Sequence, residues 1–262
     1  MRADKFFAEK FGSRTKAAEA IEKGWVLLNG KPIKPKDEVK DTDEITFVTA
    51  EETFVSNGGY KLARALKTFP VQLDGKIAVD IGASTGGFTD CLLQNGIKKV
   101  YAIDVGECQL APSVAADKRV IAMDNTNARY LEKKDFSERI DVAVTDVSFI
   151  SLQLILPAVY AVLDENGFAF VLVKPQFECE KKNIGKSGIV HPSAHAGIVK
   201  KLLAFCTQIG LYPHGIVNAP VRKGKNIEYV LYLKKTMGNE SSERIVEQVK
   251  QLVKRNTSGE LE

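Results

Sequence analysis

Residues 77–93 read IAVDIGASTGGFTDCLL, an apolar run followed by a glycine-containing turn and a second largely apolar segment. The run predicts a buried strand and the later segment a helix. Gly82, Gly86 and Gly87 permit a tight turn and a close approach of the backbone to a ligand. A GxGxxG dinucleotide fingerprint counted from Gly82 would need glycine where Ser84 stands, so the stretch disfavours an NAD site.

Beyond Lys76 the chain alternates apolar runs with helical stretches, which predicts an α/β fold with a parallel sheet covered by helices. The ligand of such a sheet lies over the carboxyl ends of its strands. Asp104 ends the second strand, 22 residues after Gly82, where a carboxylate accepts hydrogen bonds from both hydroxyls of a ribose. A nucleoside with a cationic or polar tail fits this pattern better than a diphosphate. The expected strands are 77–82, 100–105, 120–123, 141–147, 168–175, 215–220 and 228–234.

Asp80, the glycines and Asp104 together resemble the S-adenosylmethionine pocket of class I (Rossmann-like) methyltransferases. The resemblance implies that residues 124–126 lie near the adenine and Asp146 near the reactive methyl group. Taken singly, each of these residues is also explained by helix capping at a strand-to-helix loop. The cofactor-binding residues expected on this basis are Asp80, Gly82, Ala83, Ser84, Gly86, Gly87, Phe88, Asp104, Asp124, Asn125, Thr126 and Asp146.

Four charged residues need explanation together, namely Lys61, Asp146, Lys174 and Glu228. Asp146 and Lys174 close two apolar strands, where a charge is costly unless it is paired or faces a cleft. Lys61 precedes the first strand and Glu228 opens the last, and each of the four taken singly is also explained as a surface residue. As a set they resemble the lysine, aspartate, lysine, glutamate tetrad of FtsJ-type ribose 2′-O-methyltransferases. The strings YKLARAL, DIGASTGGFTDCLLQNG, TDVSFISLQLILP, VKPQFE, IGKSGIV and NIEYVLYL occur in the order typical of the TlyA family of ribosomal RNA methyltransferases, also named haemolysins.

This resemblance implies a role for each of the four residues as catalytic groups. Lys174 either accepts the proton of the ribose hydroxyl as a neutral amine or stabilises the alkoxide as a cation. Asp146 orients Lys174 and shapes the methyl-donor end of the site. Glu228 anchors the two lysines, and Lys61 holds the 2′-oxygen or the neighbouring phosphate.

The first 36 residues carry a net charge of +5, whereas residues 37–54 carry −6, so the whole-chain value of +4 hides a basic segment. A helix after Ser13, an Asn29-Gly30 hairpin and a strand ending near Val48 predict a small α+β domain. The segments RADKFFAEK, SRTKAAEAIEKGWVLLNGKPI and DEVKDTDEI resemble the small RNA-binding domain shared by a ribosomal small-subunit protein, tyrosyl-tRNA synthetases and pseudouridine synthases. The implied phosphate-facing residues are Arg14, Lys16, Lys23 and Lys31, although a solvated helix face explains the charge alone.

The remaining sequence features indicate a function less specifically. Lys181, Lys182 and Lys186 lie in a loop expected to cover the site and to touch RNA, although solvation explains them equally well. His191 and His195 do not complete a metal site, and no metal is expected. The domains expected are 1–48 for RNA binding, 49–58 as a linker, 59–238 for methyl transfer, and 239–262 as an amphipathic helix, packed on the body or a partner, with a polar tail.

The sequence therefore predicts a cytoplasmic enzyme that uses S-adenosyl-L-methionine to methylate a ribose 2′-hydroxyl in ribosomal RNA or ribosomal subunits. The resemblance to the TlyA family implies that this ribose belongs to a cytidine. No apolar run approaches the roughly 20 residues of a membrane span, and the first residues do not form a signal peptide. A non-catalytic RNA-binding assembly factor is the alternative, and a membrane-lytic haemolysin is a distant third.

Overall fold

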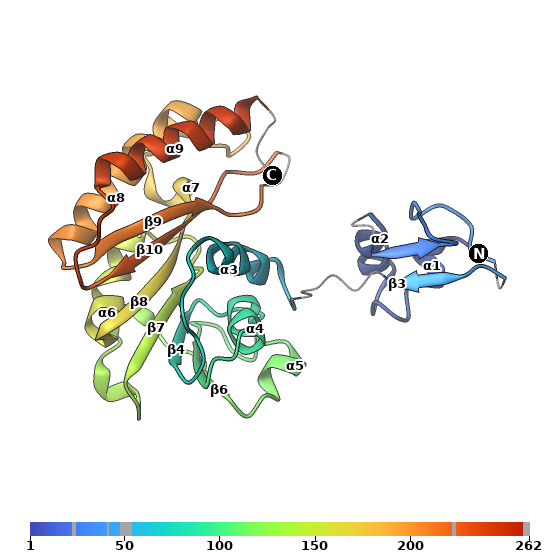
Figure 1. The fold of residues 1–262 in the computed structure, drawn as a ribbon, viewed down its shortest axis with the longest axis horizontal. Helices are drawn as coiled ribbons and strands as arrows, with labels where there is room; N and C mark the ends of the chain where they lie inside the picture. The colour runs from blue at the N-terminus through green and yellow to red at the C-terminus, as the bar shows by residue number, and fades with distance from the viewer. Residues whose placement is uncertain (23–24, 41, 48–53, 222–223, 259–262) are drawn as a thin grey trace. The chain divides into compact units, whose positions relative to one another are not determined.

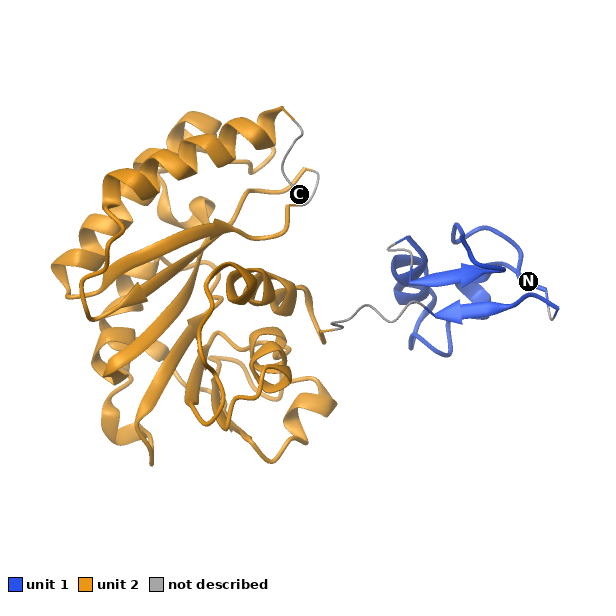
Figure 2. Cartoon of the chain, in the orientation of Figure 1, with its two compact units in different colours: residues 1–53 blue, residues 54–262 orange. Residues whose placement is uncertain are grey.

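The computed structural model describes residues 1–262 except 23–24, 41, 48–53, 222–223 and 259–262. The chain forms two compact units, residues 1–53 and residues 54–262 (Figure 2). Part of the expected linker 49–58 therefore lies outside the described residues. Its end belongs to the second unit, because Ser56 caps a helix that begins at Asn57.

The first unit contains two short helices and a three-stranded antiparallel sheet. Asn29 and Gly30 form the turn between β1 and β2 with φ of 51° and 73°, the left-handed conformation that a two-residue hairpin requires. The Ser13 hydroxyl accepts a hydrogen bond from the Lys16 amide (3.2 Å) and so caps the second helix. The elements are α1 (Ala3–Phe6), α2 (Arg14–Glu22), β1 (Val26–Leu28), β2 (Lys31–Pro32) and β3 (Ile45–Phe47).

The second unit is built on a seven-stranded sheet with the order β6-β5-β4-β7-β8-β10-β9 (Figure 1). Its central strands are buried on both faces, as expected for a sheet covered by helices on both sides. The strands are β4 (Ile77–Ile81), β5 (Lys99–Ile103), β6 (Val120–Met123), β7 (Ile140–Thr145), β8 (Leu163–Val173), β9 (Tyr212–Asn218) and β10 (Tyr229–Lys234). All seven expected strands are present.

The sheet is parallel as expected except at one strand. β10 pairs antiparallel with both β8 and β9. The connection from Asn218 to Tyr229 is too short for the crossover of a dozen or more residues that a parallel neighbour needs, so the chain turns back. Because β10 runs backwards, its first residues lie at the same sheet edge as the carboxyl ends of the parallel strands.

Helices cover both faces of this sheet. One apolar cluster joins α3 (Asn57–Thr68), α4 (Gly87–Gln94) and α5 (Pro112–Ala115) to one face. The other cluster joins α6 (Leu156–Val162), α8 (His195–Gln208) and α9 (Ser242–Thr257) to the opposite face. Ile245, Val249 and Val253 of α9 are buried, so this terminal helix packs on its own body.

Candidate active site

The turn after β4 approaches two other segments so closely that only glycine fits at two of its positions. Gly82 has φ of +81°, and a Cβ there would lie 2.9 Å from the carbonyl oxygen of Asp146. A Cβ on Gly87 would lie 2.1 Å from the Ser56 hydroxyl. The turn thus reaches both the segment that follows β7 and the first turn of α3.

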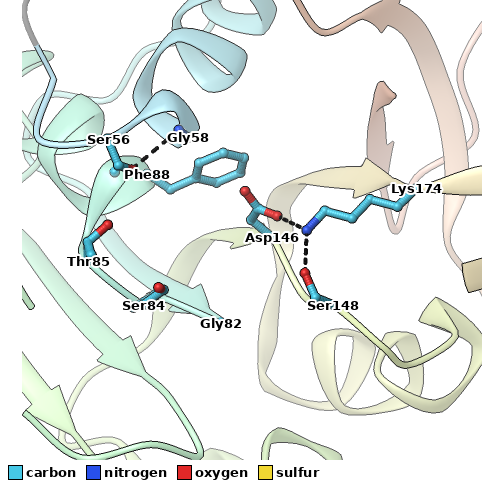
Figure 3. A pocket seen from close by; sticks show the side chains of 11 residues that line it. Ser56, Gly58, Gly82, Ser84, Thr85, Phe88, Asp146, Ser148 and Lys174 are labelled. Atoms are coloured by element: carbon cyan, nitrogen blue, oxygen red, sulfur yellow. Dashed lines mark hydrogen bonds and ion pairs between the residues drawn. The ribbon is translucent and has the colours of Figure 1, made fainter. Parts of the chain in front are cut away.

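These segments enclose a pocket of about 190 Å³ (Figure 3). Six residues expected at the cofactor line it, namely Gly82, Ala83, Ser84, Gly87, Phe88 and Asp146. Lys174, expected only as a catalytic residue, lines it as well. Four lining residues were not foreseen, namely Ser56, Gly58, Thr85 and Ser148. Ser56, Gly58 and Ser148 belong to segments far from residues 77–93 in sequence, so only the fold reveals them.

Asp80 lies beneath the pocket and does not line it. Its side chain is fully buried, and Oδ2 accepts hydrogen bonds from the Thr89 amide (2.9 Å) and hydroxyl (2.6 Å). Burial raises the pKa of Asp80 to about 7, against the effect of the Thr89 hydroxyl and with a further increase from the nearby charge of Asp146. Asp80 therefore fixes the start of α4 rather than facing the cavity.

The expected adenosine-binding residues Gly86, Asp104 and 124–126 do not line the pocket. Asp104 and residues 124–126 make hydrogen bonds with backbone groups of nearby loops. Asp104 accepts hydrogen bonds from the Ser84 amide (2.8 Å) and the Gly106 amide (2.8 Å). Asp124 accepts one from the Cys108 amide (3.0 Å). Asn125 and Thr126 donate their amides to the carbonyls of Gly106 and Asp104. These contacts order the loops that follow β4, β5 and β6, and none of them caps one of the helices described in this unit.

The four charged residues from separate parts of the chain form one connected ion-pair network. The Lys61 ammonium lies 2.7 Å from Glu228 Oε2 and 3.5 Å from Asp146 Oδ2. The Lys174 ammonium lies 2.5 Å from Asp146 Oδ1. Their side chains are between 10% and 20% exposed, so the charges are partly shielded from water.

Each member reaches this network from a different element. Lys61 comes from α3, Asp146 follows β7, and Lys174 follows β8. Glu228 immediately precedes β10, and the reversed direction of that strand brings it to the same edge. Glu228 contacts Lys61, and Lys174 is held instead by Asp146 and by the hydroxyl of Ser148 at 2.7 Å.

The residues expected to contact RNA differ in how they are held. Lys16, Lys31, Lys181 and Lys186 are exposed. Arg14 pairs with the buried Asp4 (3.0 Å), and Lys182 pairs with Glu180 (2.8 Å). Burial acts to raise the pKa of Asp4, but the hydrogen bonds from Arg2 and Arg14 outweigh it and hold that pKa below its usual value. Lys23 lies outside the described residues.

His195 is a core residue in this structure. Its Nδ1 lies 2.9 Å from the Tyr229 hydroxyl, and the side chain is buried. Burial lowers the pKa of His195 below its ordinary value. Among the described residues there is no group of three or more His, Cys, Asp or Glu side chains arranged to hold a metal ion.

Comparison with known proteins identifies both parts of the chain. Residues 54–235 match the FtsJ-like methyltransferase family, and residues 1–45 match the S4 domain. The chain belongs to the FtsJ-like methyltransferase family. Methyltransferases of this fold take their methyl group from S-adenosylmethionine, and the pocket beside the glycine turn is the candidate site for it.

Relatives of this methyltransferase match it over most of its length. The Bacillus subtilis (strain 168) protein YqxC, which carries the name of an rRNA methyltransferase, is 44% identical over 84% of this chain and 80% of its own. The Mycobacterium tuberculosis 16S/23S rRNA (cytidine-2′-O)-methyltransferase TlyA is 41% identical over 85% of this chain and 84% of its own. A Streptococcus thermophilus structure named as a hemolysin is 38% identical over 98% of each chain, with a TM-score of 0.73.

The hemolysin name raises the question of membrane contact. Within the described part of this methyltransferase, no helix combines the length and the apolar composition needed to cross a bilayer.

Proposed function

We propose that this chain transfers a methyl group from S-adenosylmethionine to the 2′-hydroxyl of a cytidine ribose in ribosomal RNA. The observation that carries the proposal is the network of Lys61, Asp146, Lys174 and Glu228 beside the glycine-turn pocket. The curated relative TlyA is named for this reaction on both ribosomal RNAs.

The residues around the pocket fit S-adenosylmethionine. The glycine turn exposes its backbone to the cavity, and the carboxylate of Asp146 lies on the pocket wall. This carboxylate is paired with the Lys174 ammonium on the same wall, so the lining carries no excess positive charge that would favour a diphosphate. When bound, S-adenosylmethionine supplies an electrophilic methyl group on a positively charged sulfur. Gly82, Ala83, Ser84, Gly87, Phe88 and Asp146 would hold it, with Asp80, Gly86, Asp104 and residues 124–126 ordering the loops around them.

The chain has two tasks in this reaction, to position the ribose oxygen and to manage its proton. Positioning alone can supply roughly 7–11 kcal/mol of the barrier in a well-aligned transfer. Lys174 takes up the hydroxyl proton as a free amine or stabilises the developing alkoxide as an ammonium, which typically adds a factor of about 10²–10⁴. Asp146 orients Lys174 toward the pocket. Lys61, held by Glu228, faces the 2′-oxygen or the neighbouring phosphate.

The S4 unit supports an RNA substrate. Lys16 and Lys31 are exposed on it, and Arg14 keeps its guanidinium more than half exposed while pairing with Asp4. Such side chains neutralise phosphates and position a protein on RNA without reading its sequence. Lys181, Lys182 and Lys186 would add phosphate contacts from the methyltransferase unit.

The alternatives make different demands on the structure. A non-catalytic assembly factor would have no use for four partly shielded charges joined in one network, because such charges are costly to bury. A membrane-lytic haemolysin would need an apolar or strongly amphipathic basic surface for the bilayer. Dye release from liposomes that persists after the pocket is destroyed would favour the haemolysin.

The test is to incubate the chain with radiolabelled S-adenosylmethionine and naked ribosomal RNA, separate subunits or whole ribosomes, and to map 2′-O-methylated nucleotides. Label on a cytidine ribose in either RNA is the expected result. Label on a base, or no label on any substrate, would contradict the proposal.

A further inference from the structure

Two adjacent loops carry tetrad residues at the carboxyl ends of β7 and β8. They are also joined by hydrogen bonds that do not involve the tetrad. The loop 146–152 follows β7 and carries Asp146, and the segment 174–178 follows β8 and carries Lys174. Glu178, the last residue of α7 (Pro175–Glu178), joins the two. Its Oε2 accepts a hydrogen bond from the Ser151 hydroxyl (2.7 Å), and its Oε1 accepts one from the Leu152 amide (2.7 Å).

The loop 146–152 has a conformation that it would not hold unaided. Phe149 has φ of +62°, and a bulky residue in this left-handed region is strained. Such strain persists only where neighbouring contacts fix it. Glu178 supplies two of these contacts, and the ring of Phe177 on the same helix lies 5.1 Å from that of Phe149.

The turn made at Phe149 presents Ser148 to Lys174. The Lys174 ammonium donates to the Ser148 hydroxyl at 2.7 Å, in addition to its ion pair with Asp146 (Figure 3). Two directions around the nitrogen are thereby occupied, and Asp146, Ser148 and Lys174 all line the pocket. An amine held from two sides has few remaining orientations, which is what a reacting group at a fixed position needs.

Partial burial and two hydrogen bonds hold the Glu178 side chain in place. The side chain is only partly exposed, and burial raises the pKa of its carboxyl against the opposing effects of the Leu152 amide and the Ser151 hydroxyl. Leu152, whose amide it binds, is 1% exposed and packs in the main core. The far end of the loop is therefore anchored to the body of the unit through Glu178.

We infer that Glu178 is a positioning residue for methyl transfer, which acts by holding the loop 146–152 so that the Ser148 hydroxyl fixes the Lys174 nitrogen. This inference rests on the proposed function. It assigns no contact with substrate or cofactor to Glu178.

The decisive variants are Glu178→Ala, Glu178→Gln and Ser148→Ala. Glu178→Ala and Ser148→Ala are each expected to lower kcat about 10- to 100-fold, because a displacement near 1 Å is enough for such a loss. In Glu178→Ala the KM for RNA and the Kd for S-adenosylmethionine should stay within about threefold, since Glu178 does not line the pocket. Glu178→Gln should restore the rate, because its amide can accept from Leu152 and donate to Ser151.

The double variant Glu178→Ala/Ser148→Ala distinguishes positioning from general destabilisation. Both single changes act through one contact, so the double variant should be no slower than about the slower single variant. Independent roles would multiply the two losses. Glu247→Ala, on the exposed face of α9, is the matched control and should leave kcat unchanged.

A second readout does not depend on activity. In protein labelled with ¹³C at lysine Cε, the Lys174 resonance should shift in Glu178→Ala and Ser148→Ala and return in Glu178→Gln. A wild-type chain that methylates no RNA would contradict the proposed function. A Lys174 signal and a kcat unmoved by Ser148→Ala would overturn this inference, and because that change removes one exposed hydroxyl, it decides the matter even if Glu178→Ala fails to fold.

Discussion

The two units of this chain use charge in opposite ways. In the S4 unit Lys16 and Lys31 are exposed, as expected for side chains that meet phosphates and otherwise remain in water. In the methyltransferase unit the tetrad side chains are at most 20% exposed, and each contacts at least one opposite charge. Exposed charge provides adaptable, salt-sensitive binding, and shielded, paired charge provides fixed geometry for a reaction. Substitutions of the exposed lysines should therefore impair RNA binding, and substitutions in the tetrad should impair the rate of methyl transfer.

Among the tests of this contrast, substitution of Asp146 should have the largest effect on methyl transfer, because Asp146 contacts both lysines of the tetrad. Asp146→Asn keeps the size of the side chain but removes its charge, so neither lysine is held as before. We expect single-turnover methyl transfer to fall by about 10³-fold, within the usual range for acid-base groups.

Asp164→Asn is the matched control for that change. Asp164 is also a shielded, paired carboxylate (16% exposed, 3.4 Å from Arg139), but it lies at the opposite end of β8. A similar loss of methyl transfer in both variants would mean that removing a shielded carboxylate impairs folding in general. Asp146 would then have no specific role in the chemistry.

Asp80 provides a test in which stability, and not rate, is measured. The unfolded carboxyl ionises near 3.8 and the folded one near 7, so the folded state binds more protons between these values. The free energy of unfolding should therefore fall as pH rises from about 4 to about 7, by an amount on the order of a few kcal/mol from this group.

Asp80→Asn should abolish that part of the slope, because the amide does not titrate and its oxygen can still accept from Thr89. Denaturant unfolding at a series of pH values measures the effect. An unchanged slope in the variant would contradict the assignment of a buried, proton-binding carboxyl beneath the glycine turn.

The exposed lysines should give the smallest effects. Lys16→Gln and Lys31→Gln are each expected to weaken RNA binding a fewfold and to reduce the salt slope by about 1, the release of counterions at one phosphate. The kcat at saturating RNA should not change. Lys134→Gln, an exposed lysine that pairs with Glu132, is the control. Equal effects at Lys134 would mean that the S4 unit has no special role in binding.

Much of the fold could be predicted because its signals are local. Alternating apolar runs marked all seven strands of the large sheet, and Asn29-Gly30 marked the hairpin. The tetrad was predicted through the resemblance to FtsJ-type enzymes, whereas the cost of a charge at the end of an apolar strand pointed only to Asp146 and Lys174. The antiparallel direction of β10 depended on the length of one connection, which the alternation of strands and helices does not convey.

The residues that sequence reasoning missed act through distant contacts. Ser148 and Lys174 are 26 positions apart, and Glu178 and Ser151 are 27 apart. Each pair meets only because β7 and β8 are neighbours and the loop turns at Phe149. Asp104 and Asp124 accept hydrogen bonds from amides of neighbouring loops, at Ser84 and Cys108, and residue type alone does not reveal these partners.

The central claim is that Lys174 acts on the ribose hydroxyl and not in binding RNA or the cofactor, and Lys174→Ala tests it most directly. Affinity for RNA and for S-adenosylmethionine should be measured alongside incorporation of labelled methyl under single-turnover conditions. The account predicts affinities within about threefold of the wild type and a rate reduced by at least about 10³-fold. A folded Lys174→Ala protein that transfers methyl at close to the normal rate would contradict it.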